Sequence, residues 1–125
     1  MSETQLTNAL CRLLERAPMR TLTYPLPGST RTPPGWPDRM FISNGLVVFC
    51  EFKASGQRPS PLQERRARDL AARGIPAWWC TFENSTNPEL IESRRAVWVS
   101  HEHMWGAPVL TTSAREFYDM LFHKT

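Results

Sequence analysis

Apolar residues recur at helical spacing near the beginning of the chain and alternate with polar residues soon afterwards. Over residues 6–17, four leucines and an alanine lie three or four positions apart, and Pro18 follows directly. This spacing predicts an amphipathic helix that ends at the proline. Residues 21–26 then alternate as in a short β-strand, and Pro25 restricts this strand to an edge or an end of a sheet.

Residues 39–53 form the most hydrophobic segment of the chain, and Asn44 and Gly45 interrupt it. Asn-Gly between two apolar runs is the strongest short signal for a β-hairpin, because a two-residue turn of this kind requires positive φ at both positions. In such a hairpin Ser43 faces Leu46. The pairing then continues one residue at a time along both strands, unless a β-bulge shifts it.

This pairing sets Asp38 opposite Glu51, with Cβ atoms roughly 4.5–5.5 Å apart. Two facing carboxylates repel each other, and burial makes the repulsion stronger. Lys53 lies on the same face as Glu51 and offsets one charge, because strand side chains repeat every two residues. A hard divalent cation offsets both charges better, and the backbone carbonyl of Phe52 adds a further oxygen ligand. The arrangement favours metal-assisted hydrolysis of a phosphodiester.

The rest of the chain alternates between helical and strand patterns. We expect a helix that begins at Pro61, with Ser60 as its N-cap, and ends at Gly74. An apolar strand over 75–82, a short helix near 89–94 and a strand over 96–100 follow. A last helix begins at Ser113, with Glu116 as its capping partner. The order predicts one α/β domain over residues 1–125 with a mixed sheet. The apolar side chains of the last helix belong either to the core or to a dimer surface.

Composition and cysteine usage exclude several classes of protein. The chain is 41% hydrophobic and 22% charged, without the roughly 18 consecutive apolar residues that a membrane-spanning helix needs. Its first residues lack the basic and apolar regions of a secretory signal. Three isolated cysteines show neither metal-ligand spacing nor a disulfide framework, and buried thiols in a reducing compartment explain them. We therefore expect a cytoplasmic protein.

Charge and aromatic content allow a nucleic-acid partner without requiring one. The net charge is +3, and arginines gather between Arg58 and Arg73. A solvated helix face and a row of phosphate contacts explain these arginines equally well. His101 and His103 alternate as on a strand, but no third ligand lies at a suitable spacing, so exposed histidines are favoured over a metal site. Buried packing is favoured over base stacking for most of the tryptophans Trp78, Trp79, Trp98 and Trp105.

Four short motifs follow one another along the first two thirds of the chain: an early Glu3, then Gly35-Trp36-Pro37-Asp38, Glu51-Phe52-Lys53 and Ser60-Pro61-Leu62-Gln63. Their pattern and order resemble the VRR-NUC (virus-type replication-repair nuclease) branch of the PD-(D/E)XK nuclease superfamily. The resemblance implies a restriction-endonuclease-like αβββαβ core over about residues 1–82, with a mixed central sheet flanked by helices. A C-terminal strand and helix extension over about residues 83–125 matches no motif of the family.

The same resemblance implies a DNA endonuclease that hydrolyses phosphodiester bonds with Mg²⁺ or Mn²⁺ in a bacterial or phage-infected cell. Minimal members of this branch look like homodimers that cut branched DNA such as Holliday junctions, and two active sites related by a two-fold axis suit a symmetric substrate. Two alternatives remain open. One is a restriction or repair endonuclease that acts on linear or nicked duplex, and the other is a DNA-binding module that keeps the fold without catalysis.

Residue roles also follow from the resemblance. Asp38 and Glu51 are the expected metal ligands, with Glu3 as a third acid that binds directly or through water and the Phe52 carbonyl as a further ligand. Lys53 is the expected catalytic lysine. Gln63 is expected to reach toward the scissile phosphate or its water, although a capping box with Ser60 explains the same residue.

Four residues are candidates for contact with DNA. Family members often carry basic or polar residues on the strand before the loop that contains Pro37 and Asp38, which we call the PD loop. Arg31 is the nearest replacement for them here. Trp36 adjoins Asp38 in a loop, where its ring can touch DNA. Arg58 and Arg65 belong to the arginine-rich segment that follows Glu51-Phe52-Lys53.

Overall fold

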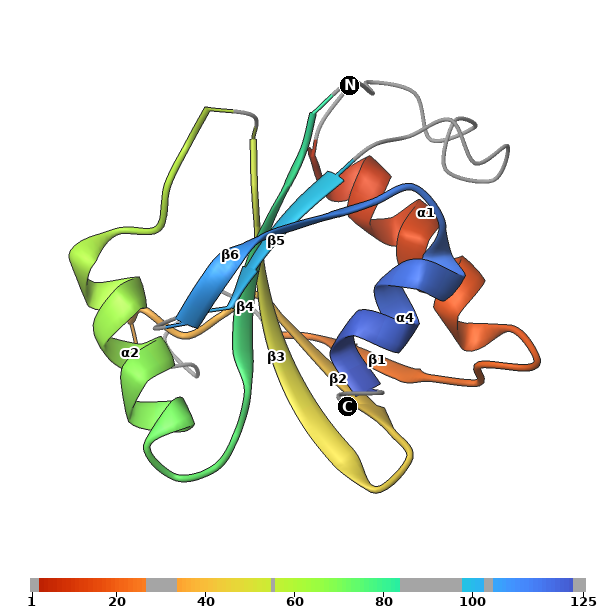
Figure 1. The fold of residues 1–125 in the computed structure, drawn as a ribbon, viewed down its shortest axis with the longest axis horizontal. Helices are drawn as coiled ribbons and strands as arrows, with labels where there is room; N and C mark the ends of the chain where they lie inside the picture. Colours follow the sequence, from red (N-terminus) through yellow and green to blue (C-terminus); the bar gives the residue numbers. More distant parts are fainter. Residues whose placement is uncertain (1–2, 27–33, 55, 84–97, 103–104, 123–125) are drawn as a thin grey trace.

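A computed structural model of the chain describes residues 3–26, 34–54, 56–83, 98–102 and 105–122 (Figure 1). These residues form a six-stranded mixed sheet with the strand order β1-β2-β3-β4-β5-β6. The pairing of β3 with β4 is parallel, and the other four pairings are antiparallel. The strands are β1 (Leu22–Pro25), β2 (Arg39–Ser43), β3 (Leu46–Lys53), β4 (Ala77–Phe82), β5 (Trp98–Glu102) and β6 (Trp105–Thr111).

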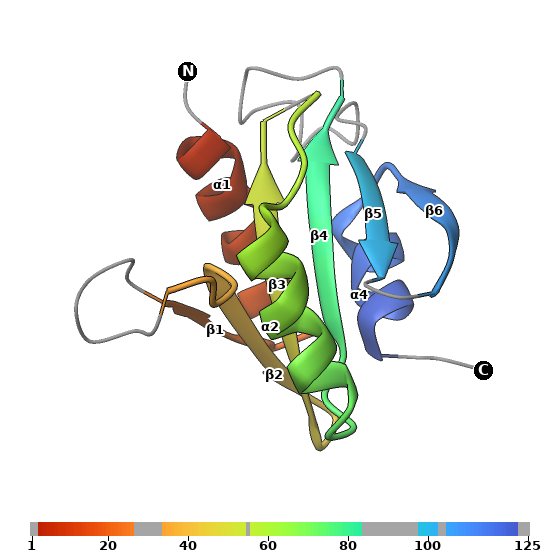
Figure 2. The same ribbon diagram turned by 90° about the vertical axis from the view of Figure 1, so that its left-hand side faces the viewer.

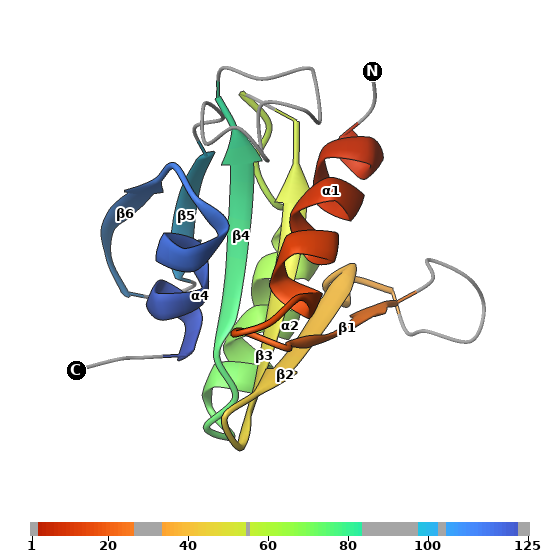
Figure 3. The same ribbon diagram turned by 90° about the vertical axis from the view of Figure 1, so that its right-hand side faces the viewer.

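Helices cover both faces of this sheet. α1 (Glu3–Glu15) and α4 (Ala114–Phe122) lie on one face, and α2 (Pro61–Ala71) lies on the other (Figures 1 and 3). α2 connects the parallel strands β3 and β4 and lies over them, as such a crossover requires (Figure 2). The expected α/β class with a mixed sheet flanked by helices is thus confirmed. Within the described ranges, no helix is long and apolar enough to span a membrane.

The hairpin between β2 and β3 has the predicted turn and register. Asn44 and Gly45 have φ of 53° and 73°, so both central residues adopt the positive φ that the turn requires. Ser43 pairs with Leu46, and the pairing continues without a bulge to Arg39 opposite Cys50. The Asn44-Gly45 turn therefore sets the alignment of the β3 residues 46–50 against β2.

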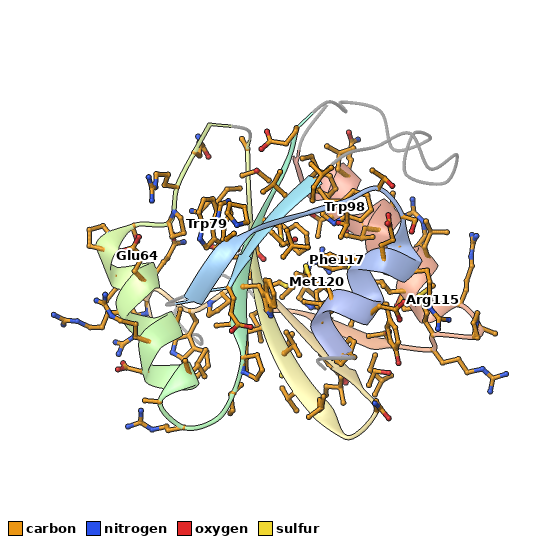
Figure 4. All side chains as sticks on the ribbon, viewed as in Figure 1. Glu64, Trp79, Trp98, Arg115, Phe117 and Met120 are labelled. Carbon is orange, nitrogen blue, oxygen red and sulfur yellow. The ribbon has the colours of Figure 1, made fainter. Side chains whose placement is uncertain are left out.

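The side chains form two hydrophobic clusters, one on each side of the sheet. The larger cluster lies beneath α1 and α4, where Trp98 and Phe117 are fully buried (Figure 4). Met120 packs against it, and Leu121 and Phe122 are buried within it, so the last helix supplies core rather than a dimer surface. The smaller cluster lies beneath α2 and consists of Phe49, Ala67, Leu70 and Ala77.

The C-terminal third differs from the sequence-based expectation in two places. β6 was not predicted, because Pro108 interrupts its short apolar run. β6 is the last strand of the sheet, and an edge strand tolerates a residue without an N–H group. Before α4, Ser113 is the expected cap, because its Oγ accepts from the Glu116 N–H at 3.1 Å. The Glu116 carboxylate, however, accepts from the backbone N–H and hydroxyl of Thr112, one residue earlier than in a standard capping box. The helix expected near 89–94 lies outside the described residues.

The three cysteines are free and buried, as expected. Burial raises the pKa of the Cys11 thiol to about 11 and also raises the pKa of Cys50 well above its usual value of 9.0. Since the thiolate is the reactive form, both effects suppress reaction with thiol reagents. We expect no cysteine to react with a disulfide reagent such as DTNB in the folded protein, and all three to react in guanidinium chloride. Rapid labelling of the native protein would contradict this arrangement.

Candidate active site

Asp38 lies one residue before β2 and is held by its backbone on both sides. Its carbonyl accepts a hydrogen bond from the N–H of Leu26 at 2.8 Å, which continues the β1–β2 pairing. Its N–H donates to Oε2 of Glu51 at 3.1 Å, and the Phe52 N–H donates to Oδ2 of Asp38 at 3.4 Å. Each carboxylate thus reaches the backbone of the other strand. The expected meeting of Asp38 and Glu51 is present.

The loop before Asp38 is seated on α2, and this explains the glycine of the GWPD motif. Gly35 has φ of +85°, and a Cβ there would lie 2.6 Å from Cγ of Leu62. A side chain is therefore excluded both by backbone conformation and by space. Nε of Arg66 donates to the carbonyl of Pro34 at 3.2 Å and fixes the loop further. The sequence showed Arg66 only as one member of an arginine-rich helix.

Trp36 has a packing role in this loop. Its ring meets Phe49 edge-to-face, with centroids 5.6 Å apart, and is half-buried against the cluster beneath α2. This contact ties the PD loop to the centre of β3. The DNA contact predicted for Trp36 stays a prediction.

Glu51 and Lys53 lie on the α2 face of β3, because Phe49, two residues earlier, packs under α2. Glu51 is 7% exposed, which is rare for a carboxylate. Nζ of Lys53 lies 3.8 Å from Oε1 of Glu51, and the lysine side chain keeps partial contact with solvent. The ammonium group therefore compensates a buried negative charge while it stays within reach of a second anion.

Gln63 caps α2 as expected and also contacts Glu51. Its backbone N–H donates to Oγ of Ser60 and its Oε1 accepts from the Ser60 N–H, so the capping box is complete. Its Nε2 also donates to Oε1 of Glu51 at 2.6 Å. The cap thus orients the amide so that it holds the carboxylate. This contact with Glu51 differs from the expected reach toward a phosphate or water.

Glu3 is the first residue of α1, and its side chain lies outside the described part of the structure. The buried side chains of α1 belong to the cluster on the face of the sheet opposite Glu51. α1 begins near the end of the sheet at which β3 ends, as Figure 3 shows. The described residues therefore do not place a third carboxylate beside Asp38 and Glu51.

The donor atoms at this site suit a hard divalent cation. Among the described residues, no group of three or more His, Cys, Asp and Glu side chains gathers anywhere. The donors available are the carboxylates of Asp38 and Glu51 and the Phe52 carbonyl, which points to the same strand edge as the Phe52 N–H. Mg²⁺ and Mn²⁺ use such oxygen sets and complete their coordination with water and phosphate. The residues present thus fit the expected metal as a partial ligand set.

The arginines predicted to contact DNA do not lie together on one element as far as the structure describes them. Arg58 and Arg65 are exposed, in the loop before α2 and on α2 itself, and Arg31 lies outside the described residues. The charge of Arg58 acts on His101, since it lowers the pKa of that imidazole in addition to the larger effect of burial. Arg58 is therefore near enough to His101 on β5 for its charge to act there.

Two aromatic residues near the site were not identified as a pair from the sequence. Trp79 and His101 are paired across β4 and β5, and their rings stack with centroids 4.0 Å apart and an interplanar angle of 7°. His101 was expected to be exposed, but it is half-buried by this stack. Trp78 and Trp98 are buried as expected, and the Trp105 side chain lies outside the described residues. The stack depends on the β4–β5 pairing, for which no local signal exists.

No family model matches the chain, and no curated protein matches its sequence.

Proposed function

We propose that this protein is a metal-dependent DNA endonuclease of the PD-(D/E)XK type, and that it belongs to the VRR-NUC branch. The observation that carries the proposal is the meeting of Asp38 and Glu51, with Nζ of Lys53 3.8 Å from the Glu51 carboxylate. A purely structural protein gains nothing from two adjacent carboxylates beside a buried strand, because their repulsion costs stability. A divalent cation that interacts with phosphate removes that cost.

The order of the elements supports this assignment. α1, β1, β2, β3, α2 and β4 follow one another along the chain, which is the αβββαβ order of a restriction-endonuclease-like core. β5, β6 and α4 extend the sheet and the larger cluster beyond that core. The proposed catalytic residues lie at the start of β2, the end of β3 and the first turn of α2.

Asp38 and Glu51 would hold the cation, with the Phe52 carbonyl as a further ligand. When bound, the cation supplies polarisation and charge neutralisation of the phosphate group. Lys53 presents a compact positive charge to the negative charge that develops on the phosphorus oxygens during hydrolysis. Gln63 holds Oε1 of Glu51 in place, so it acts as a positioning residue for a ligand.

Branched DNA is the proposed substrate, on the strength of the resemblance to minimal VRR-NUC nucleases. The proposed active site contains one pair of facing carboxylates. One such site cuts one DNA strand at a time. Symmetric cleavage of a four-way junction requires two such sites in fixed relation. A homodimer with a two-fold axis supplies them.

The experiment that tests the proposal compares two labelled DNA substrates of equal sequence content. Purified protein is incubated with a four-way junction or with linear duplex in Mg²⁺, in Mn²⁺ or in EDTA, and its mass in solution is measured by light scattering. We expect metal-dependent cutting of the junction by a dimer. Cutting of duplex alone would retain the chemistry and indicate a restriction or repair nuclease. Binding without cutting in any metal would indicate a DNA-binding module.

A pair of variants separates the two contacts of Gln63. Gln63→Ala removes the hydrogen bond to Glu51, and we expect it to lower the cleavage rate roughly 10- to 100-fold, as loss of a residue that orients a metal ligand typically does. Ser60→Ala removes the capping hydroxyl but leaves the Ser60 N–H that holds the Gln63 amide. It should cost about 1 kcal/mol of stability with little loss of rate.

The readouts are single-turnover cleavage and urea denaturation, performed on both variants. Equal losses of rate in Gln63→Ala and Ser60→Ala would show that Gln63 acts through the helix cap alone.

A further inference from the structure

Trp79 and His101 continue the row of side chains that contains the two carboxylates. Asp38 faces Glu51, Glu51 pairs with Trp79 across β3 and β4, and Trp79 pairs with His101 across β4 and β5. Partners on neighbouring strands point to the same face, so all four side chains lie on the α2 side of the sheet. Strands are about 4.8 Å apart, which places the two rings roughly 5 and 10 Å from Glu51 along the row.

Among the described residues, no helix covers this part of the sheet. α2 lies over β3 and β4, whereas β5 and β6 lie beside it (Figure 2). Trp79 projects from β4 toward the α2 side, as Figure 4 shows, and remains half-buried. Leu110, paired with Val99 on the same face, is 62% exposed. We call the surface formed by Trp79, His101, Val99 and Leu110 the aromatic shelf.

The chemistry of the aromatic shelf suits a nucleobase. Burial and the nearby Arg58 lower the pKa of His101 below 6.5, although Glu83 acts in the opposite direction. The imidazole is therefore uncharged at neutral pH and forms a parallel aromatic stack with the indole. Arg58 adds positive charge near the imidazole, and Lys53 adds positive charge beside Glu51, which pairs with Trp79. Aromatic side chains beside cations are the combination by which proteins bind single-stranded nucleic acid, because bases stack on the rings and phosphates meet the charges.

We propose that the aromatic shelf binds an unpaired nucleobase that flanks the scissile phosphate, with Arg58 on the neighbouring phosphate. The inference rests on the proposed nuclease function and narrows its substrate class. A base can stack on a side chain only when it has left the base stack of the duplex. DNA with unpaired nucleotides next to the cut site is thus the preferred substrate, and a fully paired duplex is disfavoured.

The test measures binding in EDTA, where no cutting interferes. Two fluorescein-labelled probes of equal length are used, oligothymidylate and the same sugar-phosphate chain with every base removed. We expect the wild-type protein to bind oligothymidylate roughly 5- to 100-fold more tightly than the abasic chain. Trp79→Ala and His101→Ala should lose most of this preference while they keep the affinity for the abasic chain. His101→Phe, which retains a flat ring, should preserve it.

Tyr24→Ala is the matched control, because Tyr24 is an exposed aromatic residue on the opposite edge strand β1. It should leave the base preference unchanged. Arg58→Ala should weaken the binding of both probes equally. It should also reduce the slope of log affinity against log salt concentration by about one. Thermal denaturation verifies the fold of each variant, and Trp79→Leu, which fills much of the same space without a ring, replaces Trp79→Ala if the latter unfolds.

The outcomes separate this inference from the function on which it rests. A wild-type protein that cuts DNA but binds both probes equally, or ring-deleted variants that keep the preference, would overturn the aromatic shelf and leave the nuclease intact. A folded protein that neither binds nor cuts any DNA would overturn both.

Discussion

Glu51→Gln is expected to lower the rate of metal-dependent DNA cleavage by roughly 10²- to 10³-fold or more, the scale of losing one preorganised electrostatic group in an active site. The substitution keeps the size of the side chain but replaces one of the two carboxylate oxygens with an NH2 group, whereas Oε1 accepts from Gln63 and Oε2 accepts from the Asp38 N–H. It therefore removes the negative charge and one accepting oxygen, and it leaves the volume of the side chain unchanged. Loss of rate would therefore reflect loss of cation binding rather than loss of packing.

Mn²⁺ binding distinguishes the loss of a metal ligand from the loss of the catalytic lysine. Mn²⁺ binding, followed by electron paramagnetic resonance, should be lost in Glu51→Gln and retained in Lys53→Ala, although both variants fail to cleave. This difference follows because Glu51 provides ligand oxygens, whereas Lys53 provides a positive charge for the phosphate. Glu15→Gln is the control. Glu15 is the exposed last residue of α1, and the one hydrogen bond described for its side chain comes from Thr23. A folded Glu51→Gln protein that cleaves at the wild-type rate would refute the assignment.

Phe117→Ala is expected to reduce the free energy of unfolding by roughly 3–5 kcal/mol, the range found when a large aromatic side chain is removed from a core. The Phe117 ring is fully buried and contacts the rings of Phe41, Phe52 and Trp98, with centroids 5.9–6.4 Å apart. It thereby joins α4 to β2, β3 and β5. Because domains of this size are stable by only about 5–15 kcal/mol, the loss would be a large fraction of the total.

Met120→Ala provides the comparison on the same helix. Met120 is only partly buried against the larger cluster, so its truncation should cost about 1 kcal/mol. Guanidinium denaturation followed by circular dichroism measures both losses. The cleavage rate per folded molecule should stay within a few-fold of wild type in each variant, because Phe117 contacts Phe52 on the face away from Glu51. Similar losses for Phe117→Ala and Met120→Ala would contradict the central place of Phe117 in this core.

The acidic pair shows how far short-range signals reach. Asn44 and Gly45 define the hairpin turn, and the turn defines which residues of β2 and β3 face each other. The proximity of Asp38 and Glu51 was predictable from those two residues and the strand periodicity. The capping box of Ser60 and Gln63 was predictable from a spacing of three. In each case the interacting residues are close in sequence, so few alternative arrangements compete.

Other parts of the site depend on contacts between distant segments. The sequence allowed Gln63 to cap the helix, to serve the site or to do both, and only the seating of α2 on β3 and β4 brings the capping residue into contact with Glu51. Gly35 marked a turn, but its close approach to Leu62 depends on where α2 lies. Trp36 was expected at the DNA surface, whereas the position of Phe49 gives it a packing partner.

The sequence by itself determined the α/β class, the hairpin, the helix caps and the opposition of Asp38 and Glu51, because these follow from backbone preferences and from side-chain periodicity within one turn or one hairpin. The tertiary structure alone decided that β4 pairs in parallel with β3 and that Trp79 and His101 stack in the same row as Glu51. It also decided that β6 forms the last strand of the sheet despite Pro108. These features arise from the burial of α2 and α4 against opposite faces of one sheet. Such burial couples residues far apart in the chain, and no local pattern encodes it.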